Sequence, residues 1–449
     1  MKALNLKTFF ITLISLLGAC LRIACSSSDM ETTEDDTNNT VPTTTNLPQI
    51  INVPLPPETN TIWVDADSAS NGNGTQSSPF NSLRSAESWA MNNPATRPLY
   101  IRCRGHETLS AYLYFYANGA GPRGEIVITS WDDTETYTLQ LGTSNDPEQF
   151  RLMGSYLILD GRDMVNPKFR IHAMYRGLRI GDSDYTTEYI TVWRIEVYGA
   201  GYYGIGTDGG AHFNIFNNNL HDNFNGMYPN SGHDVAVSNN LIYNNELYGI
   251  HHNCHYDLPR VAEAYRWVYN GNLLVNNVRG GCFYSGGSQV DDCGHLDDVV
   301  VKNNIIMDHT EWGWRISDTE YPCNIMENIR VYNNTFYNNY QALYNSHRDG
   351  ISPPNPAMLG IARNNLFIGN TFDMVYRQGS GWEDESDNMN GDAEAIVTDI
   401  NDSLFMRLPA NSALIDAGYD LAAENVRTGY FGVSRPQGSG YDIGAHECP

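Results

Sequence analysis

Three stretches of this sequence repeat one pattern, paired asparagines between apolar residues, and they decide the fold. They are FNNNLHDN (residues 216–223), VSNNLIYNN (237–245) and YNGNLLVNN (269–277). Three more copies follow as VKNNIIMDH (301–309), VYNNTFYNN (331–339) and ARNNLFIGN (362–370). The first residues of the aligned pairs are Asn217, Asn239, Gly271, Asn303, Asn333 and Asn364, with steps of 22, 32, 32, 30 and 31 residues. A period of this size indicates stacked units that cannot bury their apolar faces alone.

Each copy consists of short alternating apolar segments interrupted by Asn or Gly turns, which predicts strands rather than helix pairs. The leucine pattern of leucine-rich repeats is absent, and regular hairpin turns, which a propeller needs, are absent too. The sequence therefore predicts an all-β, single-stranded, right-handed parallel β-helix with one repeat per coil. Asparagines that recur at one turn should then stack as a ladder and satisfy buried turn backbone. Weaker copies begin at Tyr156 and Val192.

The charge balance excludes one class of partner. Lys+Arg number 27 against 52 Asp+Glu, for a formal net charge of -25, and after the first ten residues the only lysines are Lys168 and Lys302. Phosphate binding needs many cations, so we expect no nucleic-acid partner. The net charge also slows the approach of a polyanion, although a local Arg/His patch can dominate within a screening length of about 8 Å.

The first residues have the features of an export signal. Two lysines precede an apolar run, and the string LGAC ends at Cys20. LGAC resembles a bacterial lipobox, which implies a lipidated Cys20; Cys25 is the alternative lipidation point, and a simple secretory signal is the other interpretation. We therefore expect export and a lipid anchor to the bacterial cell envelope, with no other membrane contact.

The predicted organisation has three parts. Residues 1–20 are the signal, residues 21–58 form a Ser/Thr/Asp/Pro-rich disordered tether, and residues 59–449 form the β-helix. Within the β-helix, the strong repeats span 189–371 and a closing segment spans 410–449. The segment PFNSLRSAESWAM (79–91) predicts a short amphipathic helix that caps the open N-terminal end. We expect a monomer.

The chain also resembles a known group of proteins. The Asn-Asn repeats are similar to those of the pectin-lyase-like superfamily of parallel β-helices. TIWVDADSASNGNGTQSSPFNSL (61–83) resembles the entry segment of secreted members, and NSALIDAGYD (411–420) with RPQGSGYDIGAHE (435–447) resembles their closing segment. The resemblance implies this fold and a carbohydrate-active protein. It does not specify the reaction, because the superfamily includes lyases, hydrolases, esterases, epimerases and non-catalytic proteins.

A candidate site follows from the strand after each Asn turn. Strand side chains alternate, so the residue after an inward apolar one should point outward. The expected outward residues are Tyr228, His251, Phe283, Arg315 and Tyr344, then Asn230, Asn253, Ser285, Ser317 and Ser346, with Asp208 from the preceding coil. In this alignment Cys282 belongs to the core. The loops 254–265, 286–298, 318–328 and 347–358, which include His347 and Arg348, should form a wall beside these residues.

The residue types on this face suit β-elimination of a uronic-acid polymer. A lyase removes the proton alpha to the carboxyl group, neutralises the carboxylate and protonates the leaving oxygen. We assign His251 as base and Tyr228 as proton donor, with Arg315 or Asn253 as the carboxylate ligand. The substrate-binding candidates are Asn230, Asn253, Phe283, Tyr344, Asp208, His347 and Arg348. Many β-helix lyases of the superfamily use a Lys or Arg base with bound calcium, so the resemblance leaves Arg open as base.

Two alternatives remain. A glycoside hydrolase needs two carboxylates facing one bond, and the candidates are Asp208, Asp291, Asp292, Asp297, Asp298, Asp318 and Glu320. A non-catalytic surface glycan-binding protein is the third class. The cluster DDCGHLDD (291–298) could bind calcium, although it has no EF-hand pattern, and no other metal or cofactor is predicted.

Overall fold

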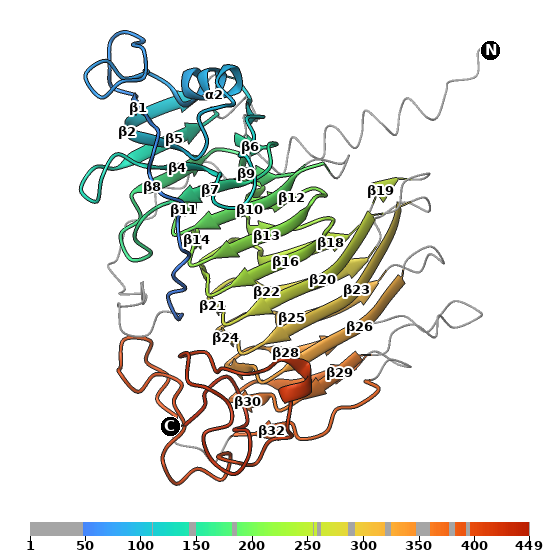
Figure 1. Cartoon of the computed structure of the whole chain (residues 1–449). Coiled ribbons are helices and arrows are strands. Elements are labelled where there is room, and N and C mark those ends of the chain that lie inside the picture. The colour runs from blue at the N-terminus through green and yellow to red at the C-terminus, as the bar shows by residue number, and fades with distance from the viewer. Residues whose placement is uncertain are drawn as a thin grey trace, which may run out of the picture. The chain divides into compact units, whose positions relative to one another are not determined.

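The computed structural model describes residues 48–109, 111–142, 150–181, 186–254, 256–257, 262–285, 292–318, 325–346, 360–376, 382–391 and 396–448. Within these residues the chain winds into coils whose strands form one sheet of ten strands and one of 22 strands (Figure 1). No helix in these ranges is long and apolar enough to cross a membrane.

The ten-stranded sheet contains one strand from each coil, all paired in parallel. Its strands are β3 (Leu113–Phe115), β6 (Phe150–Leu152), β9 (Arg176–Ile180), β12 (Tyr203–Thr207), β15 (Asn225–Tyr228), β18 (Tyr248–Cys254), β22 (Arg279–Ser285), β25 (Trp312–Asp318), β28 (Gln341–Asn345) and β31 (Phe372–Tyr376).

The 22-stranded sheet consists of two parallel rows that share the long strand β2. The first strand row is β1 (Thr61–Asp65), β2 (Leu99–Leu109), β4 (Ile126–Ser130), β7 (Leu157–Asp160), β10 (Glu188–Trp193), β13 (Ala211–Phe216), β16 (Gly232–Ser238), β20 (Ala262–Asn270), β23 (Asp292–Lys302), β26 (Ile325–Tyr332) and β29 (Gly360–Arg363). The second strand row continues from β2 as β5 (Tyr137–Leu141), β8 (Phe169–Ala173), β11 (Glu196–Tyr198), β14 (Asn219–His221), β17 (Leu241–Tyr243), β21 (Leu273–Val275), β24 (Ile305–Met307), β27 (Thr335–Tyr337), β30 (Leu366–Ile368) and β32 (Met389–Asn390). The short β19 (Tyr256–Asp257) pairs antiparallel with β23.

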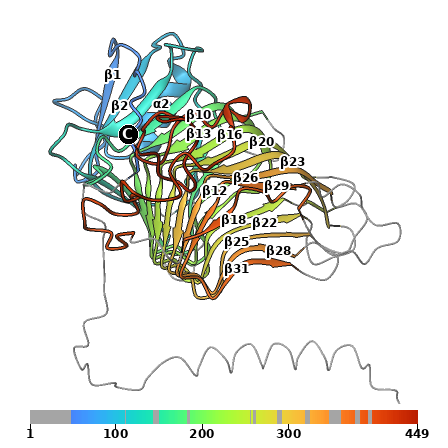
Figure 2. The same ribbon diagram turned by 90° about the horizontal axis from the view of Figure 1, so that it is seen from below.

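One apolar core fills the space inside the coils. Figure 2, which looks along the stack, shows the ten-stranded sheet and the first strand row on different sides of this interior. Inward side chains such as Ile250, Trp267 and Trp314 are fully buried and belong to one hydrophobic cluster. A coil alone would expose these faces to water, so the stacking itself buries the core.

The predicted asparagine stack is present and is the main polar feature of the interior. The first residue of each pair, for example Asn217 or Asn239, adopts positive φ (53° and 54°) and turns the chain between the two strand rows. Asparagine tolerates this left-handed conformation better than most residues. The second residues are buried, and each Nδ2 donates to the Oδ1 of the next coil at 2.9–3.0 Å. They are Asn218, Asn240, Asn272, Asn304, Asn334 and Asn365, and the ladder ends at the half-buried Asn388, which accepts from Asn365.

A second, parallel ladder lies five residues further along each coil. Its members are Asn223, Asn245, Asn277, His309, Asn339 and Asn370. His309 replaces an asparagine here: its Nδ1 accepts from the backbone N–H of Asn277 at 3.2 Å, while its buried Nε2 has no partner. Burial lowers the pKa of His309 to about 4, so the ring stays neutral inside the ladder.

Replacing His309 by asparagine is expected to reduce the acid sensitivity of the fold. The unfolded chain takes up a proton on this histidine near pH 6.5, whereas the folded chain does so near pH 4, so stability is lost as pH falls between these values. At pH 4.5 this costs roughly 2–3 kcal/mol. Urea midpoints at pH 7.5 and 4.5 should therefore differ less in His309→Asn than in the wild type. An exposed control, His106→Asn, should behave as the wild type does; equal pH dependence in all three proteins would contradict this account.

The N-terminal part contains the one helix predicted from sequence, α2 (Leu83–Asn92), which begins after the N-cap Ser82. Its buried residues Leu83 and Ala86 join the main core, and the carboxylate of Glu107 accepts from the Leu83 backbone N–H at 2.8 Å. Its role as a cap of the open end stays a prediction. Residues 48–58, the end of the predicted tether, lie along the coils, where the Nδ2 groups of Asn217 and Asn239 donate to the Gln49 carbonyl oxygen.

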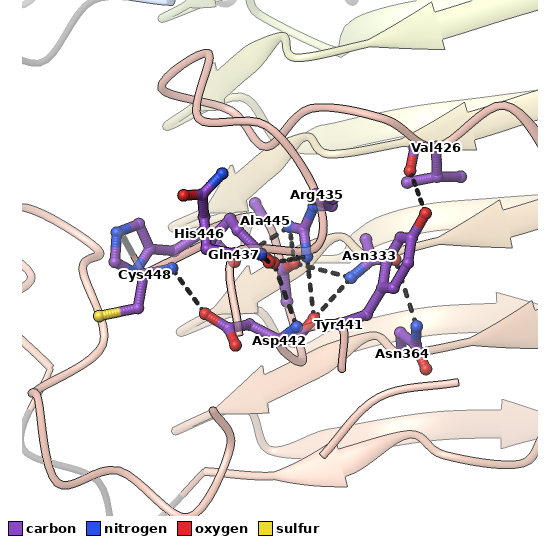
Figure 3. A network of polar contacts seen from close by, with 12 residues as sticks. Asn333, Asn364, Val426, Arg435, Gln437, Tyr441, Asp442, Ala445, His446 and Cys448 are labelled. Carbon is purple, nitrogen blue, oxygen red and sulfur yellow. Dashed lines mark hydrogen bonds and ion pairs between the residues drawn. The ribbon is translucent and has the colours of Figure 1, made fainter. Parts of the chain in front are cut away.

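The C-terminal segment, which includes the 3-10 helix η1 (Ala422–Glu424), folds against the last coils around a buried arginine (Figure 3). Arg435 pairs with Glu447 at 2.8 Å, and both side chains are fully buried. The same guanidinium donates to the carbonyl oxygens of Asp442, Gly444 and His446. Asn333, at an Asn turn, donates to the carbonyl oxygens of Asp442 and Gly444, so this segment is attached directly to the coils.

Candidate active site

The outer face of the ten-stranded sheet carries one row of aligned outward positions, called here the column. Alternation along each strand sends its neighbours into the core, and the parallel register aligns the outward positions of successive coils. From the N-terminal end the column reads Tyr114, Arg151, Arg179, Gly206, Tyr228, His251, Cys282, Arg315, Tyr344 and Val375.

Tyr228 and His251 occupy the middle of the column on adjacent strands. Their rings meet edge to face with centroids 5.1 Å apart, and the imidazole also stacks on Tyr248 at 4.2 Å. Two residues beyond His251, the buried Asn253 donates through Nδ2 to the phenol oxygen of Tyr228 at 2.5 Å. An imidazole, a phenol and an amide therefore converge on one point of the face.

The surroundings of the Tyr228 phenol favour its protonated form. Burial raises the pKa of Tyr228 well above its usual value, and the neighbouring Tyr202 adds to the increase. Tyr248, beside His251, also has its pKa raised, to about 12, mainly by burial. Near neutral pH both rings keep their phenol protons, so Tyr228 suits a proton donor better than a base.

Arg315 lies two strands beyond His251, with Cys282 between them. Its Nε donates to the Ser346 hydroxyl at 2.9 Å, and its guanidinium lies over the rings of Trp312 (4.8 Å) and Tyr344 (5.2 Å). These contacts fix the plane of the guanidinium, which is the group that binds carboxylates through paired hydrogen bonds. Arg315 lies three strands away from Tyr228 in the sheet, and neighbouring strands are about 4.8 Å apart. The two side chains would therefore contact different parts of an extended ligand.

Arginines are concentrated on this sheet although the whole chain is acidic. Its strands contain Arg151, Arg176, Arg179, Arg279 and Arg315. Arg279 donates to the Tyr248 phenol oxygen at 3.0 Å and pairs with Glu311 at 2.8 Å, so it adjoins the His251 ring stack. Arg279 was not among the predicted site residues, although an alignment of RGGCFYS (279–285) with YGIHHNC (248–254) places it beside Tyr248.

Asp208, a predicted substrate ligand, lies at the N-terminal side of this group. Its carboxylate is buried, with 4% of the residue exposed, and it pairs with both Arg151 and Arg179. A carboxylate in this position holds the two guanidinium groups beside each other. Asn230 is half-buried beyond β15, and its backbone N–H faces the Thr207 hydroxyl at 3.4 Å.

The prediction that Phe283 points outward is wrong. Cys282 is buried, as predicted, but it lies at an outward position of β22, where it packs with Tyr248 and Trp312. In the observed register Ile250 pairs with Gly281 and His251 with Cys282, which sends Phe283 fully into the core. Gly280 and Gly281 are consecutive, so the sequence allowed two alignments of this strand with its neighbours. The correct one places Gly281 at an inward position, where a Cβ atom would meet the Trp314 ring at 2.3 Å. Trp314 of the next coil fills the space that a glycine leaves. Tyr284, not Ser285, therefore follows Asn253 on the outer face.

Several predicted residues lie outside the described part of the chain: Cys20, His347, Arg348, Asp291 and Glu320. Most of the predicted wall does too, including residues 258–261, 286–291, 319–324 and 347–358. The residues of the predicted wall that the structure does describe belong to strands rather than to loops. Residues 262–265, 292–298 and 325–328 extend strands of the first strand row, so Asp297 and Asp298 lie on β23 rather than in a loop.

The described part of the DDCGHLDD cluster contains one group that could hold a cation. Ligand atoms of His295, Asp297 and Glu327 lie within 4.8 Å of one another on β23 and β26. His295 Nε2 is 2.9 Å from the Glu327 carboxylate, and Asp298 pairs with Arg330. Oxygen ligands suit calcium, but an imidazole does not, so this trio fits the predicted calcium site poorly.

Comparison with known proteins agrees with the fold. Residues 157–294 match the family model described as "Right handed beta helix region". Comparison of the sequence with curated proteins gives no match. Among solved structures, the chain is similar to a pectate lyase (Pel9A), with 14% identity and a TM-score of 0.60, covering 88% of this chain and 98% of that one.

Two other solved structures share the architecture more loosely. The A-module of the Azotobacter vinelandii mannuronan C-5 epimerase AlgE4 has 14% identity and a TM-score of 0.45, covering 73% of this chain and 95% of that one. An alginate lyase from Paenibacillus sp. has 14% identity and a TM-score of 0.41, covering 71% and 98%. At such identities the likeness concerns the fold alone. By its strand pairing, its family match and its likeness to the pectate lyase structure, the chain is a right-handed parallel β-helix protein.

Proposed function

We propose that this protein is a polysaccharide lyase that cleaves a uronic-acid-containing polymer by β-elimination along the column. The observation that carries the proposal is the convergence of Tyr228, His251 and Asn253 on a face that is rich in arginine. The names of the similar structures, a pectate lyase and an alginate lyase among them, agree with it.

In this proposal the reaction divides between two neighbouring side chains. His251 takes the proton alpha to the uronic carboxyl group, the bond from the beta carbon to the glycosidic oxygen breaks, and a carbon–carbon double bond forms. Tyr228 gives its phenol proton to the leaving oxygen. Asn253 donates to the phenol oxygen and Tyr202 makes a further hydrogen bond with the same phenol, so these two side chains position the group that gives the proton. No water is consumed.

The arginines supply the electrostatic part of the mechanism. A uronate that loses its alpha proton accumulates negative charge on its carboxyl group, which a nearby guanidinium stabilises. Arg279, beside the His251 stack, is the nearest such group along the register, and Arg315 would bind the carboxylate of a sugar further along the polymer. Arg151 and Arg179 are paired with Asp208, and Arg279 is paired with Glu311, so these guanidinium groups would act on a uronate through oriented hydrogen bonds rather than through a net positive charge.

The remaining assignments belong to the same proposal. The chain is exported and anchored through lipidated Cys20, its partner is the polysaccharide, and it acts as a monomer. Helix α2 covers the N-terminal end of the stack.

An assay with a panel of acidic and neutral polysaccharides tests the proposed reaction. A lyase produces an unsaturated uronide, so ultraviolet absorbance should rise with an acidic polymer and stay flat with a neutral one. New reducing ends without this absorbance would replace the proposal by hydrolysis with paired carboxylates. Binding without either signal would replace it by a non-catalytic glycan-binding protein.

A further inference from the structure

A separate cleft of about 530 Å³ lies on the outer face of the first strand row, near its N-terminal end. Its floor comes from one register position on three adjacent strands, Arg102, Thr129 and Asp160. Leu55 and Glu58 line it from the segment that runs along the coils. The column belongs to the ten-stranded sheet, so this cleft is a different surface.

Three of the four cations that line the cleft have matched carboxylates. Arg102 donates to both oxygens of Glu58, at 2.8 and 2.5 Å. Arg194 makes three contacts of 2.8–3.0 Å with Asp160, and Arg162 pairs with Asp133. These pairs hold the walls in place and leave little arginine charge for a ligand.

Lys168 is the unmatched cation of the cleft. In the described part of the chain its ammonium group has no ion pair and no hydrogen bond, although it lines the cleft. The other described lysine, Lys302, instead donates to the Asn425 carbonyl oxygen at 2.8 Å. A chain with so few lysines thus presents one unpaired ammonium group, and it does so inside a cleft.

Two further polar atoms of the lining are buried without a partner: the Thr129 hydroxyl oxygen and the Arg162 Nε. Such orphaned groups are rare and each costs about 1–3 kcal/mol, so they indicate a place that a ligand or water completes. Both can donate a hydrogen bond. The cleft therefore offers donors that need acceptors, plus one positive charge.

We propose that this cleft binds a small sugar acid whose single carboxylate pairs with Lys168 and whose oxygen atoms accept from Thr129 and Arg162. The exposed carboxylates of Asp133 and Asp163 at the rim would accept from its hydroxyl groups. A ligand with two negative charges is disfavoured, because the lining carries four carboxylates and one unmatched cation. The volume lies within the usual range for small-molecule sites. The proposal does not depend on the reaction at the column.

Calorimetric titration of the full chain with glucuronate, and with glucose as the neutral probe, tests the site. We expect glucuronate to bind and glucose to give no signal. Lys168→Met should weaken glucuronate binding at least tenfold, and Lys168→Arg should retain it within about threefold, because the charge remains. Thermal melting checks that each variant is folded.

Two control variants assign the binding to this cleft. Arg84→Met removes an exposed cation on α2 and should bind glucuronate as the wild type does, whereas His251→Ala alters the column and separates binding there from binding in the cleft. No binding by the wild type, or unchanged affinity in Lys168→Met, would overturn the proposal. Binding that is lost in His251→Ala but kept in Lys168→Met would overturn it too, by assigning the ligand to the column.

Discussion

Tyr228→Phe is expected to lower kcat on the polymer substrate by about 10²–10⁴-fold, the usual contribution of a positioned general acid. The substitution keeps the aromatic ring that packs against His251 and removes only the hydroxyl group that accepts from Asn253. The proton is needed when the leaving oxygen departs and not when substrate binds, so KM should change little. Initial rates of ultraviolet absorbance across substrate concentrations separate the two constants.

The matched control is Tyr189→Phe, which removes an exposed phenol from β10 on the other sheet and should keep wild-type kinetics. A Tyr228→Phe variant with at least a third of the wild-type kcat would remove Tyr228 from the mechanism. A variant whose KM rises while kcat holds would make the phenol a substrate-binding group instead.

Arg435→Met should destabilise the C-terminal segment by about 3–5 kcal/mol, because it leaves a buried carboxylate without its partner. Glu447 would remain fully buried, the His446 carbonyl oxygen would lose its donor, and the Gly444 carbonyl oxygen would keep only Asn333. Burial lowers the pKa of Arg435 to about 10, which still leaves the guanidinium charged at neutral pH. Chemical denaturation combined with hydrogen exchange of residues 396–448 measures the loss.

Two related variants sharpen this test. Arg435→Lys keeps the charge, but an ammonium group cannot match the planar fork of contacts, so we expect an intermediate loss. Arg427→Met removes an exposed arginine from the same segment and should change stability by less than about 0.5 kcal/mol. An Arg435→Met protein within 1 kcal/mol of the wild type would show that the ion pair adds nothing beyond an apolar contact of similar volume.

The asparagine pattern predicted the coils because its physical cause is local. Each coil needs a residue with positive φ and, directly after it, a buried side-chain amide. A pair of consecutive asparagines, such as Asn217–Asn218 or Asn333–Asn334, supplies both. The second ladder was present in the same strings, five residues on, but its His309 breaks the letter pattern while preserving the hydrogen bond.

The outward residues of the site were harder to predict from the sequence, because the register of each strand depends on the strands of the neighbouring coils. His251, Tyr228 and Arg315 were placed on the outer face by simple alternation, and they lie there. The alignment of Cys282 could not be chosen within its own coil, where two glycines fit equally well. Arg151 and Arg179 were missed because the repeats are weak before Val192.

Gly281 and Trp314 limit how such a chain can lengthen or shorten during evolution. A stack of similar coils could in principle gain or lose one unit without harm, since each unit meets its neighbours through the same strand pairing. Here one coil leaves a hollow and the next one supplies the indole that occupies it. Duplicating either coil alone would bring an indole against an ordinary inward side chain or leave a void. These two coils are therefore expected to be inherited, exchanged or transplanted only as a pair.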